Sequence, residues 1–306
     1  MNASIDLPRL IEQFGSEEKC RAFLEALRWP DGVECPRCKG KKVSRIEARK
    51  QFECASCRHQ FSATAGTVFH DSHLPMWKWF LAVYILCESK KGVSALQLKR
   101  MLGVSYKTAW YLCHRIREAM MAANGSSTPL AGTVEVDDTF IGGKAGKWRP
   151  IPEKVNVVGM VERDGRLRLQ VVADLSTVSL RIAATRHIGA NIDLIITDEW
   201  AAYVNALGPE YKRRYKRIKH KETYVRSDII YGKIHTNSIE SAFSLLKRGI
   251  IGSWHHVSVK HLQRYLDEMS YRFSERGNPR LFSLTIATLA GTRPVTFKAL
   301  TAEKVA

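Results

Sequence analysis

Three acidic motifs in the second half of the chain carry residues whose types and spacing could do chemistry. Asp137 follows a β-rich run and precedes a Gly-Gly turn, Asp198 closes the most apolar run, and Glu240 opens a helical pattern. Binding sites collect at strand ends of α/β sheets, so two strand-end carboxylates and one helix carboxylate could converge. Such oxygen ligands select Mg²⁺ or Mn²⁺, and two ions of this kind can activate an attacking oxygen and stabilise the leaving oxygen of a phosphodiester.

Each acidic motif also has a purely structural explanation. Asp198 could cap a helix that begins near Glu199. Asn237 and Glu240 have the Asn-x-x-Glu spacing of a capping box at the start of a helix. Taken one motif at a time, these explanations stay open, whereas all three motifs together in one basic chain favour a metal site.

Two Cys-x-x-Cys pairs near the start of the chain predict a metal site of another kind. They have the spacing of a zinc ribbon and consist of Cys35, Cys38, Cys54 and Cys57. Four thiolates complete a closed tetrahedral zinc site, so we expect one structural Zn²⁺ and no catalysis there. His59 and His70 could substitute as ligands, but four sulfurs already suffice. The remaining cysteines, at apolar helical positions, are interpreted as buried hydrophobic residues.

The composition points to a polyanionic partner. The 306 residues carry a net charge of +18, with 45% hydrophobic and 9% aromatic residues, which is typical of a globular protein. Such an excess of positive charge favours nucleic acid over an anionic membrane surface. No apolar run is long enough to span a bilayer, and the cysteine usage fits a reducing cytoplasm. We therefore predict a cytoplasmic, DNA-associated protein without a membrane partner.

The first 128 residues read as small modules that could hold DNA. A helix is expected over residues 16–29, the ribbon over 31–61, and apolar helices over 76–89 and 94–102. A Gly-Val-Ser turn then leads into a helix over 106–121 that carries Lys107 and Arg115 at expected polar positions. Helix, tight turn and basic helix together form the helix-turn-helix pattern, so both basic residues are predicted to contact DNA.

A polar linker over residues 122–129 separates these modules from a segment rich in strands. Strands are expected over 133–141, 155–162, 167–173 and 192–197, with an Asp-Gly hairpin turn between the second and third. A helix over 176–188 lies between the last two. The pattern predicts a mixed α/β sheet.

A basic run of seven Lys or Arg in eleven residues stands between the second and third acidic motifs. It includes Lys212, Arg213 and Arg214. A charge run is often only a solvated face. Because this run would flank the acidic site, phosphate binding is the favoured interpretation.

The acidic and cysteine motifs together resemble those of insertion-sequence transposases of the DDE superfamily, in the zinc-ribbon ISXO-type group. The matching motifs are the ribbon cysteines, Val-Glu-Val-Asp-Asp-Thr-Phe-Ile-Gly-Gly, Thr-Asp-Glu-Trp-Ala-Ala-Tyr, and His-Thr-Asn-Ser-Ile-Glu through Gly-Ser-Trp-His. The resemblance runs from about residue 17 to residue 273. It implies an α/β fold: an RNase H-like mixed-sheet catalytic domain after a small zinc ribbon and a helix-turn-helix module.

The resemblance also implies roles for individual residues. Asp137, Asp198 and Glu240 would be the metal-binding catalytic acids, with two Mg²⁺ or Mn²⁺ ions. Asn237, one helical turn from Glu240, is an alternative third residue, because some members of the group are described with Asn in that role. Lys247 and its neighbour Arg248 would contact DNA, although a lysine there could also be a solvated helix residue.

Two further acids lie close to the first motif. Asp138 stands where relatives often have Glu, and we interpret it as a neighbour of the site and not as a ligand. Glu135 shares a strand face with Asp137 and is an outside candidate for a ligand.

The predicted domains are an N-terminal helix with zinc ribbon over 1–70, a helix-turn-helix region over 71–128, a catalytic domain over 129–275 and a C-terminal tail over 276–306. We expect a transposase that binds terminal inverted repeats in double-stranded DNA, frees a 3′-OH at each element end and joins it to target DNA. A homo-oligomer on DNA is implied. A non-catalytic DNA-binding regulator and an RNase H-like nuclease without strand transfer are the alternatives.

Overall fold

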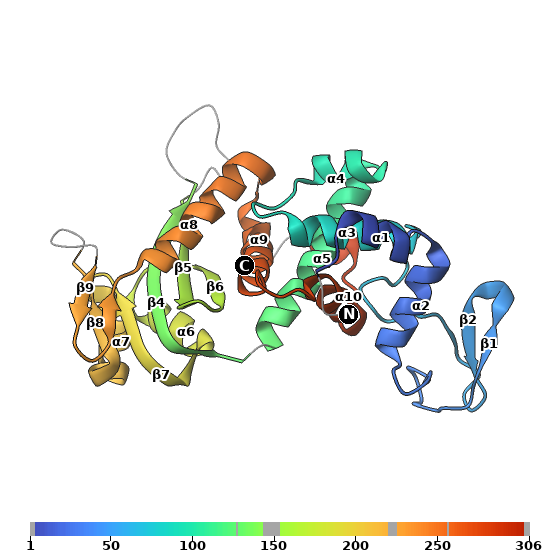
Figure 1. The fold of residues 1–306 in the computed structure, drawn as a ribbon, viewed down its shortest axis with the longest axis horizontal. Helices are drawn as coiled ribbons and strands as arrows, with labels where there is room; N and C mark the ends of the chain where they lie inside the picture. Colours follow the sequence, from blue (N-terminus) through green and yellow to red (C-terminus); the bar gives the residue numbers. More distant parts are fainter. Residues whose placement is uncertain (1–3, 127, 143–153, 220–224, 256, 303–306) are drawn as a thin grey trace. The chain divides into compact units, whose positions relative to one another are not determined.

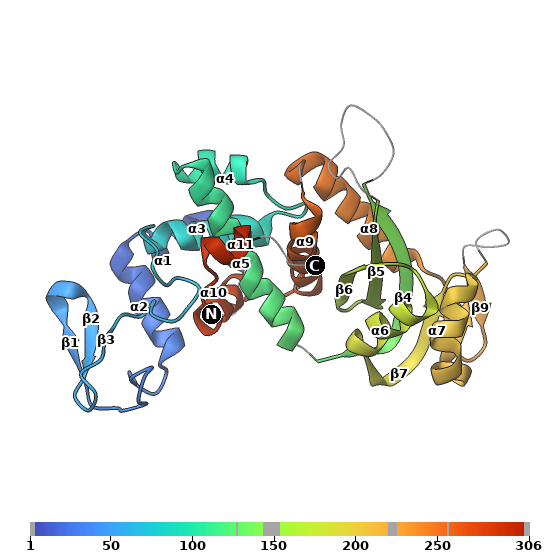
Figure 2. The same cartoon turned by 180° about the vertical axis from the view of Figure 1, so that it is seen from behind.

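The computed structural model describes residues 4–126, 128–142, 154–219, 225–255 and 257–302 (Figure 1, and from behind in Figure 2). It divides into two compact units. Unit 1 consists of Met1–Ser89, Ala95–Ala123 and Gly277–Ala306, and unit 2 of Lys90–Ser94 and Asn124–Arg276. In the described part of the chain, no helix has both the length and the hydropathy to cross a membrane.

Unit 1 is built mainly from helices. They are α1 Leu7–Phe14, α2 Glu17–Arg28, α3 Met76–Glu88, α4 Ala95–Leu102, α5 Tyr106–Ser126, α10 Leu281–Gly291 and α11 Phe297–Thr301. The helix expected over 16–29 is confirmed as α2, and its first turn is capped by the Ser16 hydroxyl, which accepts from the backbone N–H of Lys19. The last predicted helix of this region is longer than expected, because α5 continues through much of the predicted linker.

The helical core of unit 1 joins segments from both ends of the sequence. The ring of Phe14 on α1 lies 5.2 Å from that of Phe80 on α3 and 5.5 Å from that of Phe282 on α10, between centroids. The backbone N–H of Val68 also donates to the carbonyl of Leu289. The last segment of the sequence, expected as a tail, therefore contains two helices and belongs to the core of this unit.

The ribbon is a small three-stranded antiparallel sheet in unit 1. Its elements are β1 Val43–Ile46, the 3₁₀ turn η1 Glu47–Arg49, β2 Gln51–Cys54 and β3 Gln60–Phe61. Phe52 and Phe61 pack against Trp29, which follows α2. This aromatic cluster supports the loops that carry the four cysteines, since so few strand residues offer little other core.

Unit 2 is organised around a five-stranded sheet with the order β6-β5-β4-β7-β8. The strands are β4 Leu130–Ile141, β5 Val155–Glu162, β6 Leu167–Val172, β7 Ile188–Thr197 and β8 Tyr215–Arg217. Neighbours β4, β5 and β6 pair antiparallel, whereas β7 runs parallel to β4 and β8 runs parallel to β7. This arrangement confirms the mixed α/β sheet of the RNase H-like class.

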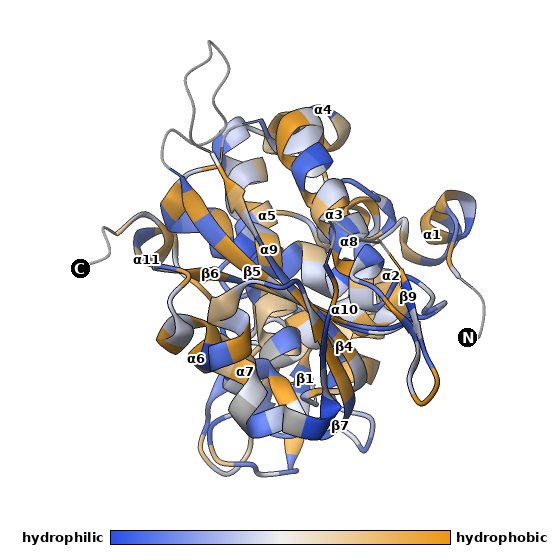
Figure 3. Cartoon of the chain, turned by 90° about the vertical axis from the view of Figure 1, so that its left-hand side faces the viewer, coloured by the Kyte–Doolittle hydropathy of each residue, from blue (hydrophilic) through white to orange (hydrophobic). Residues whose placement is uncertain are grey.

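Helices cover both faces of the sheet, which explains why its strands are largely hydrophobic (Figure 3). One face packs against α6 Thr177–His187 and α7 Ala201–Tyr211. The other packs against α8 Asn237–Gly249, the π-helical turn η3 Ile250–Trp254 and α9 Val259–Ser274. Alternate residues of β4 therefore face different helices: Val134 and Val136 face α6 and α7, and Ile141 faces α8 and α9.

Three short strands of unit 2 were not anticipated from the sequence. The basic run contains the 3₁₀ turn η2 Lys212–Arg214 and the edge strand β8, and its last two residues lie outside the described part. A two-stranded hairpin follows, made of β9 Arg226–Asp228 and β10 Gly232–Ile234. Strong charge hides the apolar alternation by which strands are usually recognised.

Candidate functional site

Asp137 and Asp198 are brought together by the parallel pairing of β4 and β7. Glu135 pairs with Ile196, and continuing this register by two residues places Asp137 beside Asp198. Asp198 directly follows β7, as expected. Asp137 lies within β4 and not at its end. The strand runs on to Ile141, as expected for residues 133–141, and β5 pairs with it from Val134 to Ile141.

Asp138 lies on the opposite face of β4 from Asp137. The hydroxyl of Tyr203 on α7 donates to its Oδ1 at 2.9 Å. Burial raises the pKa of Asp138, and it also raises the pKa of Tyr203. Asp138 therefore belongs to the contact between the sheet and α7, which agrees with its interpretation as a neighbour of the site.

Glu135 lies in β4, is fully buried, and holds the beginning of α8. Its Oε2 accepts from the backbone N–H groups of Ser238 at 2.8 Å and Ile239 at 3.2 Å, and its Oε1 accepts from the Ser238 hydroxyl at 3.1 Å. These amides are among the donors that a helix leaves unsatisfied at its N-terminus. Glu135 thus supplies from the sheet the negative charge that this helix end favours.

Glu135 also contacts the side chains of Arg163 and His235. The Arg163 Nε donates to its Oε1 at 3.2 Å, and His235 Nδ1 stands 3.2 Å from the same oxygen. Burial lowers the pKa of His235, and the nearby Arg163 lowers it further. With all these partners, Glu135 positions α8 and is not a free metal ligand. In the sequence, Glu135 could be recognised only as a charged residue that shares a strand face with Asp137.

Glu240 occupies the first turn of α8 and is exposed. Its Oε1 accepts from the Thr236 hydroxyl at 3.1 Å. The capping box considered for Asn237 and Glu240 is not formed, because Thr236 is the N-cap. The N–H of Glu240 donates to the carbonyl of Thr236, and the N–H of Asn237 donates to Nδ1 of His235. Asn237 is the first helical residue and is also exposed.

A glycine allows α8 to lie directly on the sheet next to Asp137. Gly159 of β5 pairs with Asp137 across the antiparallel ladder. A Cβ at this position would lie 2.6 Å from Ile239 Cδ1 and 2.7 Å from Phe243 Cζ, both on α8. The close approach keeps the first turn of α8, with Glu240, near the two aspartates.

The three acids share an electrostatic environment. Burial raises the pKa of Asp137 to about 7, and the charges of Asp198 and Glu240 add to that rise. Asp198 also accepts from the backbone N–H of Trp200 at 3.0 Å in a turn before α7, whose first residue is Ala201, so it does not directly cap that helix. Among the described residues, the three carboxylates do not form a ligand group close enough for one ion.

Basic side chains predicted to contact DNA lie on two elements of unit 2. Lys247 and Arg248 are exposed in the last turn of α8, and Lys247 is seven residues, or about 10 Å of helix, beyond Glu240 on the same face. Arg213 and Arg214 are exposed in η2, and Arg214 donates to the carbonyl of Ile192. The side chain of Lys212 lies outside what the structure describes.

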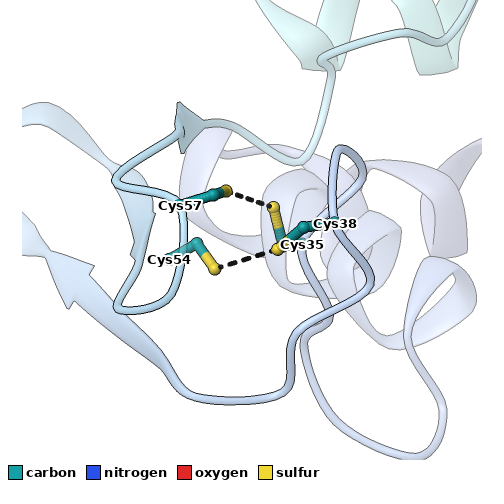
Figure 4. Close-up of side chains that lie close together, drawn as sticks. All are labelled: Cys35, Cys38, Cys54 and Cys57. Carbon is teal, nitrogen blue, oxygen red and sulfur yellow. Dashed lines mark hydrogen bonds between the residues drawn. The ribbon is translucent and has the colours of Figure 1, made fainter.

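The four ribbon cysteines form a second candidate site, in unit 1 (Figure 4). Their sulfur atoms all lie within 4.8 Å of one another. The sulfurs of Cys35 and Cys57 are 3.6 Å apart, and those of Cys38 and Cys54 are 3.5 Å apart. Tetrahedral zinc with sulfur at about 2.3 Å needs separations near 3.8 Å, so the arrangement fits one zinc ion.

Both cysteine pairs lie in turns of the same design. Lys39 and Arg58, each directly after the second cysteine of a pair, have positive φ values of 61° and 56°. Backbone N–H groups then point at sulfur, and those of Cys57 and Ser56 lower the pKa of Cys54 to about 6. A Cβ on Gly40 would lie 3.3 Å from the Cys38 sulfur, so this position favours glycine. Neither His59 nor His70 belongs to this group.

The predicted helix-turn-helix segment forms α4 and α5 joined by a tight turn. Gly103 has a positive φ of 59°, and the Ser105 hydroxyl accepts from the N–H of Thr108 to begin α5. Lys107 is exposed, with its Nζ 4.6 Å from the centroid of Phe297.

The expectation that Arg115 lies on a polar face is wrong. Arg115 is buried, donates to the carbonyls of Val68 and His70, and stacks on the ring of Trp79. Since its guanidinium serves the core of unit 1, Arg115 is not available to DNA in this structure. Arg117 is buried as well.

Comparisons with known proteins match both the segment of the acidic residues and the segment of the cysteines. A family model described as an ISXO2-like transposase domain matches residues 129–274, and one described as a transposase zinc-ribbon domain matches residues 15–60. A protein described as an uncharacterized protein in transposable element ISH50, from Halobacterium salinarum, is 28% identical over 279 residues, covering 86% of this chain and 92% of that protein. The chain therefore belongs to the IS1595-type transposases, with a zinc ribbon ahead of the transposase domain.

Proposed function

We propose that this transposase cuts a DNA strand at each end of its element and joins the freed 3′-OH to target DNA, using Asp137, Asp198 and Glu240 as metal-binding acids. The observation that carries the proposal is the parallel register that sets Asp137 beside Asp198, under the helix that bears Glu240. Asp138 is bonded to Tyr203 on the other face of the sheet, which leaves Asp137 as the acid of that pair in the site.

The donor set fits Mg²⁺ or Mn²⁺, because all three side chains offer hard oxygen ligands. Bound together, two such ions would supply activation of the attacking oxygen and stabilisation of the leaving oxygen in an in-line displacement. The raised pKa of Asp137 supports this fit. Burial and the neighbouring acids disfavour its ionised carboxylate, and a bound cation would stabilise that form.

The remaining residues would position the helix and the DNA. Glu135 fixes the first turn of α8 on the sheet and so fixes the place of Glu240. Lys247, exposed on the same helix face, would bind a backbone phosphate near the reacting end. Arg213 and Arg214 would extend this phosphate contact beyond the acids.

Unit 1 would recognise the terminal repeats. The turn between α4 and α5 and the exposed Lys107 at the beginning of α5 suit a helix that enters the major groove by its N-terminal end. The zinc ribbon would add a second contact with DNA. Pairing of two element ends implies that more than one copy of the chain acts together.

The test is cleavage of a labelled duplex carrying the element's terminal repeat, with Mg²⁺ or Mn²⁺. We expect nicking at the repeat boundary that is lost in Asp198→Asn and Glu240→Gln and retained in Asp138→Asn. Loss of cleavage in Asn237→Ala, with Glu240→Gln active, would move the third role to Asn237. Tight binding without cleavage under either metal would instead favour a DNA-binding regulator.

A further inference from the structure

The hairpin of β9 and β10 in unit 2 ends in two isoleucines that the fold leaves in solvent. Ile229 and Ile230 have relative exposures of 104% and 80%, and hydrophobic colour marks the tip of this hairpin in Figure 3. A large hydrophobic side chain gains nothing from such a position unless something covers it.

The tip is held in one shape. Asp228 accepts from the backbone N–H groups of Ile230 at 2.9 Å and Tyr231 at 3.1 Å. Gly232, with a positive φ of 71°, then turns the chain back into β10. The isoleucines are therefore presented by an ordered turn that needs little further ordering when it binds a partner.

The hairpin also contacts η2 and the edge strand β8 of the main sheet. Lys216 of β8 forms an ion pair with Asp228 at 3.2 Å, and the Tyr231 hydroxyl donates to the carbonyl of Arg213 at 3.1 Å. Behind it, Ile234 packs on Leu194 and Ile196 of β7. Since Asp198 directly follows β7, the hairpin packs against the strand that leads to the acidic site.

The surroundings of the tip are basic. Arg226 on β9, Lys233 on β10 and Arg217 at the end of β8 are all exposed. Two exposed isoleucines with basic side chains around them suit a nucleic-acid duplex, in which phosphates flank an apolar base stack. The charge around the tip therefore selects DNA as its occupant.

We propose that Ile229 and Ile230 form a wedge that enters the base stack of duplex DNA beside the cleaved phosphodiester, while Arg226 and Lys233 contact the flanking phosphates. This inference rests on the proposed function, because it assigns the wedge to the same DNA that the three acids cut. Apolar side chains inserted between base pairs unstack them and kink the duplex. Unstacking at the cut would make the strand end accessible to the three acids.

The test uses the full chain and terminal-repeat duplexes with 2-aminopurine placed at successive positions around the cut. Wild type should raise the fluorescence at one or two adjacent positions, which reports unstacking. A double variant, Ile229→Ser with Ile230→Ser, should lose the signal and cleave the paired duplex about tenfold more slowly. A mismatch at the unstacked step should restore cleavage by this variant, because that step then needs no wedge.

The matched control is Ile182→Ser on α6, another exposed isoleucine, with a relative exposure of 55%. It should behave as wild type. Unchanged fluorescence and cleavage in the double variant would overturn the wedge, as would a change in its sedimentation without DNA, which would mark the tip as a self-association contact. A wild-type fluorescence signal without metal-dependent cleavage would contradict the proposed catalysis while still supporting insertion.

Discussion

Replacing Glu135 by Gln tests how the sheet positions α8. The carboxylate accepts from four donors: the N–H groups of Ser238 and Ile239, the Ser238 hydroxyl and the Arg163 guanidinium. A glutamine keeps one acceptor oxygen and replaces the other by an NH₂ group. The donors that bond to the replaced oxygen then lose their acceptor. We expect the first turn of α8 to loosen and cleavage to fall with it, because Glu240 lies in that turn.

The magnitude follows from the bonds that are lost. Hydrogen bonds to a charged group are worth about 1.5–3 kcal/mol each, and glutamine must give up those on one side. Removing one partner of a buried pair costs about 3–5 kcal/mol, but Arg163 keeps a side-chain exposure of 24%, so we take the lower end. Opening of this helix end should then become easier by about 3 kcal/mol, or roughly 100-fold.

Hydrogen exchange of the full-length protein measures this opening directly. The amides of Ser238 and Ile239 should exchange roughly 100-fold faster in Glu135→Gln. The control is Glu162→Gln, which removes a carboxylate bonded to Arg166 and to the N–H of Ala131. That variant should leave the α8 amides as slow as in wild type. Wild-type exchange at both amides in Glu135→Gln would refute the positioning role.

Three other predictions concern acids, zinc and a tyrosine. Because burial raises the pKa of Asp137 from 3.8 to about 7, its contribution to stability is full below pH 3.8 and is lost as pH rises through 7. Without divalent ions, Asp137→Asn should therefore melt above wild type at pH 8 and match it near pH 4; an offset independent of pH would contradict this. Cys54→Ser should lose about one zinc per chain by metal analysis, and unchanged zinc would sink the ribbon assignment. Tyr203→Phe should cost about 1–2 kcal/mol in denaturant melts, since it removes the bond to Asp138, yet leave cleavage within a few-fold of wild type.

The sequence predicted those parts of the fold whose signals are local. Short apolar runs located β5 and β6, and the Asp-Gly pair between them located their turn. The cysteine spacing located the ribbon, because the ligands of a closed zinc site come from two short turns. The strand β8 was missed because basic residues dominate it, although its neighbour β7 was recognised from its apolar run.

Features that depend on distant contacts could not be predicted from the sequence. Arg115 looked like a polar helix residue, and only the chain around Val68, 47 residues earlier, provides the carbonyls that bury it. Glu135 looked like a possible ligand because the helix that it holds begins 102 residues later. In both cases several of the partners are backbone groups, which leave no mark on the local pattern of side chains.

The division of unit 1 between the two ends of the sequence has a consequence for how the protein is made. The helix α10 supplies Phe282 to the ring cluster of Phe14 and Phe80, and the backbone of Leu289 holds Val68. A nascent chain must therefore complete unit 2 before unit 1 can close its core. A chain that ended after unit 2 would lack Phe282, so Phe14 and Phe80 would lose a ring partner from their cluster.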